Sequence, residues 1–256
     1  MIRTANPALR AETFTEFAQF APAAKVMTIQ GTVNKTAILL ACCLATGLFT
    51  WTRFENAFQA GEGLAAGHAA VAPWLWGGLI AGLIFALITI FKPTAAPITA
   101  PLYALAEGLF LGAISAMFEA AYPGIVLQAV ALTLGVLGAL LLAYTSRLIK
   151  PTENLKLGIV AATGGVFLVY MASWILGIFG IGVPFIHDSG PIGIGFSIVV
   201  IIIAALNLVL DFDFIENGAA VGAPKYMEWY GAFGLMVTLV WLYLEILRLL
   251  SKLRDR

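Results

Sequence analysis

Charged residues are scarce in this chain. They make up 11% of its 256 residues, and apolar residues make up 61%, whereas soluble domains carry about a quarter charged residues. Too few charges are available to cover a surface that faces water, which excludes an ordinary soluble domain. The net charge is zero, so the chain offers no basic surface for nucleic acid and no polybasic patch for a membrane surface. We expect a protein embedded in a lipid bilayer, with no nucleic-acid partner.

Cysteine is scarce too, and the pattern of a cleaved signal peptide is missing. Cys42 and Cys43 are adjacent within an apolar run. Neighbouring positions on a helix point in different directions, so we expect two packing residues rather than a disulfide. The first 30 residues mix charges, proline and aromatics, without a compact basic region followed by an apolar one. We expect residues 1–31 to be an N-terminal tail and residues 32–256 to be a transmembrane domain.

Long apolar runs are what the chain has in abundance. A bilayer core about 30 Å thick needs roughly 20 apolar residues of helix, and a soluble core in a chain of this length has no need of so many uncharged runs. We therefore predict an all-α, polytopic membrane protein, a bundle of seven transmembrane helices. The predicted spans are 32–52, 72–91, 98–118, 125–145, 157–179, 192–210 and 229–247.

Lysine and arginine indicate the orientation of these spans, because cytoplasmic loops carry an excess of them. With a cytoplasmic N-terminus, the inner side holds Arg3, Arg10, Lys25, Lys35, Lys92, Arg147, Lys150, Lys156 and Lys225, and the outer side holds Arg53. If all seven spans cross, the outer side also holds Arg248, Lys252, Arg254 and Arg256. Either the last span is an exception to the rule, or one segment is re-entrant and both termini are inside.

Small residues recur at four-residue spacing on two of the predicted helices. Gly78 and Gly82 lie on the second, and Ala104, Gly108 and Gly112 lie on the third. Such faces let helices approach closely in lipid. They predict a tightly packed bundle and indicate no chemistry.

A carboxylate near the centre of the third span is a candidate site, because a charge at membrane depth is costly. Glu107 lies about halfway along "PLYALAEGLFLGAIS". One interpretation is a protonated structural glutamate, hydrogen-bonded to a neighbouring helix. The other is an ion or proton site that faces a cavity. In both cases we expect Glu107 to face the bundle interior.

Two further acids, Asp211 and Asp213, follow the sixth apolar run. They differ by about 200° around a helix, so they do not face one cavity if the helix continues. Asn207 lies one turn before Asp211 and extends a polar stripe on the same face. We therefore expect Asp211 to face inward and Asp213 to lie closer to solvent or to the helix end. The alternative is an acidic helix end, followed by Glu216, that marks the membrane boundary.

The pattern of the segments resembles a known family. The third segment carries "PLYALAEGLFLGAIS", the sixth ends in "LVLDFDFIE" and the last reads "WLYLEILRLL". Together they resemble a divergent prokaryotic-type member of the Bax inhibitor-1-like family, also called the transmembrane Bax inhibitor motif family. "NPAL" near the start and "GTVNKTAILL" at the first span fit the same branch, so the resemblance covers nearly the whole chain.

The resemblance implies a seven-helix bundle with the last helix central, and a pH-sensitive leak of calcium or other cations. In better-known members an aspartate at the end of the sixth helix pairs with one midway along the seventh. Asp211 matches the first position and Thr238 the second, so the usual aspartate pair is absent here. Asp213, Glu107 or Glu245 are the acids left to partner Asp211. The resemblance also implies a bacterial plasma (inner) membrane as the location.

These residues define one expected ion or proton site, made of Asp211, Glu107, Asp213, Asn207 and Thr238. A buried carboxylate favours its protonated form and a bound cation favours the ionised one, so protons and cations compete for it. Oxygen ligands suit Ca²⁺, which makes calcium at Asp211 the expected metal. No other cofactor is expected.

The sequence also bears on two other classes of function, an intramembrane protease and a non-conducting regulator. An intramembrane protease would carry Gly-x-Gly-Asp or Gly-x-Ser-Gly; the first is absent and "GIGFSI" lacks the final glycine. The two histidines, His68 and His187, are expected in the connections between spans, whereas the general base of an intramembrane protease would lie within a span. We therefore expect no enzyme and no catalytic residue. A non-conducting regulator that binds another membrane protein or a protease is the remaining alternative, since such contacts leave no motif.

Overall fold

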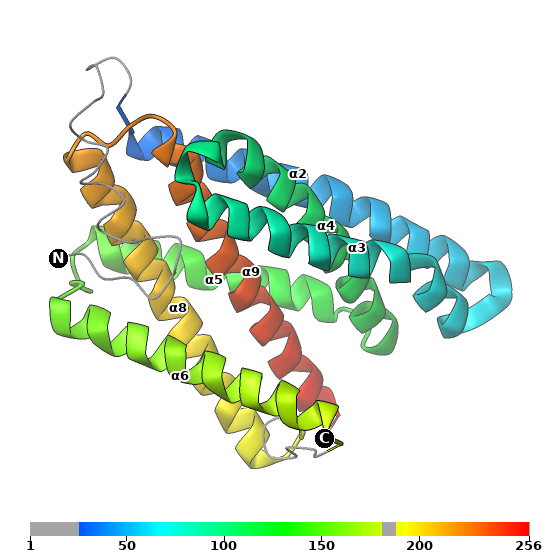
Figure 1. The fold of residues 1–256 in the computed structure, drawn as a ribbon. Coiled ribbons are helices and arrows are strands. Elements are labelled where there is room, and N and C mark those ends of the chain that lie inside the picture. Colours follow the sequence, from blue (N-terminus) through cyan, green and yellow to red (C-terminus); the bar gives the residue numbers. More distant parts are fainter. Residues whose placement is uncertain (1–25, 181–187, 256) are drawn as a thin grey trace. The chain divides into compact units, whose positions relative to one another are not determined.

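The computed structural model describes residues 26–180 and 188–255. Within these residues the chain is helical, and the only β-type pairing is an isolated bridge between Val26 and Pro224. The helices are α2 (Ile29–Ala57), α3 (Gly63–Phe91), α4 (Ala96–Ala121), α5 (Ile125–Thr145), α6 (Glu153–Ile178), α8 (Pro191–Ala220) and α9 (Met227–Arg254) (Figure 1). All seven are long and apolar enough to cross a membrane. The prediction of seven transmembrane helices is confirmed, whereas the expected structure of the tail lies outside the described residues.

The two largest extensions beyond the predicted bounds are at the start of α3 and at the end of α8. The second span begins at Gly63, after a π-helical turn (Phe58–Glu62), because Gly61 and Gly63 have positive φ values of 90° and 69° that reverse the chain there. His68 therefore lies within α3 and contacts the Phe54 ring. Its expected place in a connection was wrong, because the alanine-rich stretch around it is strongly helix-forming although it is less hydrophobic than the rest of the span. The expected position of His187 lies outside the described residues.

The other extension concerns the acidic end of the sixth span. α8 continues past Leu210 to Ala220, so Asp211 and Asp213 are interior helical residues. Asp211 and Asp213 therefore do not lie at the end of the helix, whereas their role in marking the membrane boundary stays a prediction. Only the apolar run ends at Leu210, because a helix needs continued backbone hydrogen bonding and not continued hydrophobicity.

The described chain divides into two compact units. Of the described residues, the first unit contains 127–180, 188–214 and 237–255, and the second contains 26–126 and 215–236, so α8 and α9 each contribute to both. Of the seven spans, α9 is the most buried: 61% of the residues in its 18-residue apolar segment lie inside the protein. Such burial is what a central last helix requires.

In the second unit, small residues bring α4 against α2 and α3. A Cβ atom on Gly112 would lie 2.2 Å from the Gly47 carbonyl oxygen of α2, and one on Gly78 would lie 2.6 Å from the Ala106 carbonyl oxygen of α4. The Thr46 hydroxyl of α2 donates to the Leu105 carbonyl at 2.8 Å, which backbones this close permit. The predicted role of these glycines in tight packing is confirmed.

Polar side chains connect the helices of the first unit. The amide of Asn207 on α8 reaches Thr163 on α6, and Tyr170 on α6 donates to Glu245 on α9. Near the C-terminus of α9, Lys252 donates to the Gly193 carbonyl and the Ser197 hydroxyl of α8. Hydrogen bonds of this kind stabilise contacts between membrane helices, where no water competes for the donors.

Candidate ion site

The polar stripe on α8 is buried. Asn207 is 3% exposed and Asp211 is fully buried, at 0%. They lie one turn apart on a continuous helix and so share a face. The Asn207 amide donates at 2.8 Å both to the Thr163 hydroxyl and to the Ile203 carbonyl. This leaves the amide oxygen of Asn207, an acceptor, on the same face as the Asp211 carboxylate.

Asp213 is more exposed than Asp211, as expected, but it lies neither in solvent nor at a helix end. It is 8% exposed, and its carboxylate accepts a salt bridge from Lys156 Nζ at 2.7 Å. Lys156 is itself 5% exposed and also lies 3.2 Å from Glu153. The sequence assigned Lys156 to a loop, whereas α6 begins at Glu153 and holds it in the helix. A cation at Asp213 would have to displace this ammonium group.

Glu107 faces other helices of the second unit. It is 9% exposed, and a Cβ atom on Gly82 of α3 would lie 3.0 Å from its Oε2 atom. The prediction that Glu107 points into the bundle is confirmed. Within the described residues its carboxyl group makes no hydrogen bond. The interpretation of Glu107 as a protonated structural glutamate requires such a hydrogen bond to a neighbouring helix.

The remaining predicted residues lie on α9. Thr238 is 3% exposed and belongs to the same unit as Asn207, Asp211 and Asp213, whereas Glu107 belongs to the other unit. Glu245, a candidate partner for Asp211, is 2% exposed and accepts from Tyr170 at 2.9 Å and from Arg248 at 3.1 Å. Its negative charge is thus balanced locally by Arg248.

The described residues contain no group of three or more His, Cys, Asp or Glu side chains that could hold a metal ion. Ca²⁺ takes six to eight oxygen ligands. A calcium ion at Asp211 would therefore need amide, hydroxyl or water oxygens as well, and the sequence names Asn207, one turn away on α8, and Thr238, in the same unit, for that role.

Sequence reasoning missed one buried charged cluster. Glu228, in the first turn of α9, is 0% exposed and binds Lys35 and, at 2.7 Å, Lys225. It also accepts at 2.9 Å from both the backbone N–H and the hydroxyl of Thr28, the N-cap of α2. The spacing of Lys225 and Glu228 was a local signal, but the contacts with α2 join residues far apart in the chain. This cluster is named the α2–α9 clamp below.

The fold and the buried acids define an all-α membrane protein with seven spans and ionisable groups at membrane depth. The family model described as Bax inhibitor 1 like matches residues 6–255, nearly the whole chain. The chain belongs to this family, and the resemblance seen in the sequence is confirmed. No curated protein and no solved structure matches the chain.

Proposed function

We propose that this protein is a pH-sensitive leak for calcium or other cations, with Asp211 as the group for which protons and cations compete. The observation that carries the proposal is a fully buried aspartate inside a membrane-spanning helix, on the same face as a buried asparagine. An acid at that depth is expensive to keep charged. Its protonation state should therefore respond both to pH and to a bound cation.

The other acids have different roles in this proposal. Lys156 balances the charge of Asp213, so Asp213 positions α6 against α8 and does not bind the cation. Asn207, one turn from Asp211 on α8, and Thr238, in the same unit, are the proposed neutral oxygen ligands. Glu107, in the other unit, is a separate proton-binding group.

The test is cation flux in proteoliposomes across pH, with Ca²⁺, Na⁺ and K⁺ measured separately. Asp211→Asn removes the titrating group and should flatten the pH response of flux. Asp213→Asn should keep that response but lower the free energy of unfolding by about 1–3 kcal/mol, because the buried Lys156 loses its closer acid and keeps only Glu153. If Asp213→Asn flattened the pH response and Asp211→Asn preserved it, Asp213 would be the site. Wild-type protein that passes no cation at any pH would instead be a non-conducting regulator of another membrane protein.

The same assay examines Glu107. Glu107→Gln keeps the shape of the side chain, so it should preserve the fold while shifting the pH dependence of flux. A protonated carboxyl group in lipid also reacts with hydrophobic carbodiimides, and mass spectrometry should locate that adduct at Glu107. If Glu107→Gln showed the flux of the wild-type protein at every pH, and if no carbodiimide adduct formed at Glu107, then Glu107 would be a structural residue.

The protein is further proposed to lie in a bacterial plasma membrane with a cytoplasmic N-terminus, following the lysine and arginine distribution. Because all seven helices are long enough to cross, the C-terminus then lies outside. Single cysteines at Pro151 and Ser189, in a chain with Cys42→Ala and Cys43→Ala, should label from opposite sides of intact cells. Labelling of both from one side would contradict seven crossings.

A further inference from the structure

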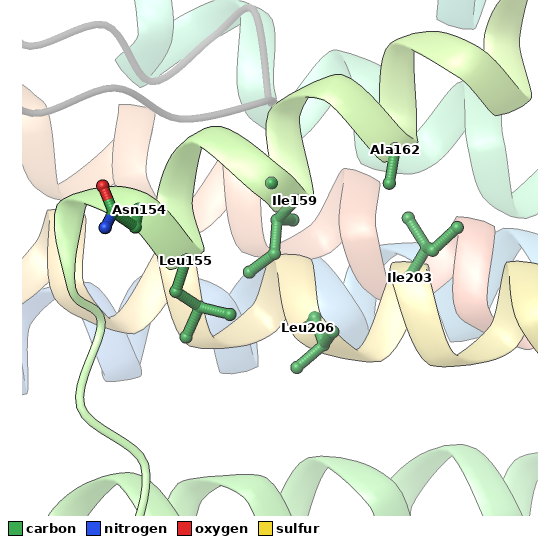
Figure 2. Close-up of a pocket in the computed structure, with 7 residues that line it drawn as sticks. Asn154, Leu155, Ile159, Ala162, Ile203 and Leu206 are labelled. Carbon is green, nitrogen blue, oxygen red and sulfur yellow. The ribbon is translucent and has the colours of Figure 1, made fainter.

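A groove of about 220 Å³ opens between α6 and α8 in the first unit. On α6 its lining runs from Asn154 to Ala162, and on α8 it consists of Ile203 and Leu206 (Figure 2). Asn154 is the one polar residue of this lining. A water-soluble ligand would find no hydrogen-bonding partner along the rest of the groove, so its occupant must be apolar.

A glycine provides the space. A Cβ atom on Gly158 would meet nothing within 4 Å. Beside it Ile159 is 3% exposed, and Figure 2 shows Leu155 and Ile159 pointing from α6 toward α8. The groove is smaller than the roughly 300–1,000 Å³ pockets that bind drug-sized ligands. It suits a narrow, flexible chain rather than a globular ligand.

The groove is open to the surface that these helices present to lipid. Leu157 on α6 is 43% exposed and Ile202 on α8 is 52% exposed, and both are next in sequence to lining residues. Since both helices are long and apolar enough to cross a membrane, the surrounding medium at this depth is the hydrocarbon of phospholipids.

One end of the groove is polar and lies near positive charge. Asn154 is in the first turn of α6, directly after the loop that contains Arg147 and Lys150, both exposed. The other charged groups here are Glu153 and Lys156, which pair with each other, and Lys156 also holds Asp213. Arg147 and Lys150 are therefore the cations available to a negatively charged headgroup.

We propose that this groove binds one acyl chain of an anionic phospholipid, with the headgroup held by Arg147 and Lys150. The apolar lining selects the chain, the glycine admits it, and the basic loop selects the charge of the headgroup. The site is independent of the cation leak: it requires only that α6 and α8 face lipid.

The experiment uses the full chain in vesicles of phosphatidylcholine and phosphatidylglycerol, with a photoactivatable diazirine in the acyl chain of one lipid at a time. After illumination, mass spectrometry maps the labelled residues. Phosphatidylglycerol should label Leu155, Ile203 and Leu206 several-fold more than Phe167 and Trp174, which are highly exposed residues of the same α6 helix. Groove labelling no stronger than that of these two residues would overturn the proposal.

Matched variants separate the chain from the headgroup. Gly158→Leu fills the groove and should abolish the excess labelling, whereas Gly165→Leu, two turns along the same face and equally open, should not. If Gly158→Leu fails to fold, Ala162→Leu fills the groove from the next turn. The double variant Arg147→Gln, Lys150→Gln should equalise labelling by the two lipids. Equal labelling of the wild-type protein by both lipids would show that the headgroup assignment is wrong.

Discussion

Glu228→Ala should lower the free energy of unfolding by about 3–5 kcal/mol, the range for breaking a buried ion pair. Glu228 is completely buried in the α2–α9 clamp and binds Lys35, Lys225 and two groups of Thr28. Lys35 is 17% exposed and would be left without its acid, whereas Lys225, at 52%, can turn to water. The loss therefore arises from Lys35 and from the N-cap of α2.

The N-cap of α2 supplies a second variant that tests the same prediction. The Thr28 hydroxyl accepts from the Gly31 N–H and donates to Glu228, so Glu228 orients the residue that begins α2. Glu228→Gln keeps an acceptor for Thr28 and should cost less than Glu228→Ala, about 1–3 kcal/mol. Stability is measured by denaturant or thermal unfolding in detergent micelles.

Glu55→Ala is the matched control for the clamp. Glu55 also lies on α2, but its partner is the exposed Gln59, one turn away. Its removal should change stability by no more than about 0.5 kcal/mol. Equal effects of Glu228→Ala and Glu55→Ala would show that the clamp does not hold α2 to α9.

Gly112→Ala should cost about 3 kcal/mol, the upper end for overpacking, although it adds a single methyl group. The new Cβ atom would lie 2.2 Å from both the Gly47 carbonyl oxygen and the Thr50 hydroxyl of α2. The carbonyl is backbone and cannot rotate away, so α2 and α4 would have to separate. That separation would also strain the hydrogen bond from Thr46 to Leu105.

Gly77→Ala is the control for helix propensity. Its Cβ atom would meet nothing within 4 Å, on a neighbouring helix of the same unit. Alanine is the better helix former by about 1 kcal/mol, so this variant should be neutral or slightly stabilised. The two glycine variants should therefore differ in sign, and unfolding in detergent distinguishes them. A Gly112→Ala protein as stable as wild type would rule out the close approach of α2 and α4.

The seven spans, the close-packed glycines and the burial of Glu107, Asn207 and Asp211 could be predicted from the sequence. Each of these predictions rests on the free energy of transferring a residue type from water to lipid. That free energy does not depend on which other helices the segment contacts. A run of roughly 20 apolar residues crosses, and an acid inside such a run must turn away from hydrocarbon. The partners of the charged residues were not predictable in this way.

Lys156 shows why. By sequence it belongs to a positive cytoplasmic loop, but in the structure it is buried against Asp213, 57 positions later. Nothing near Lys156 in the chain indicates that pairing. Asp213 was accordingly expected near solvent, and its ion pair is the reason that we propose a positioning role for it instead of a ligand role.

The sequence by itself determined that this is a membrane protein with seven helices and which of its acids lie at membrane depth, because transfer from water to lipid depends on residue type and local spacing. Only the tertiary structure decided which charges are compensated: Asp213 by Lys156, Glu245 by Arg248, and Glu228 by Lys35. It also decided that α8 continues to Ala220. Ion pairing depends on the distance between side chains that folding brings together, and two of these three pairs join different helices.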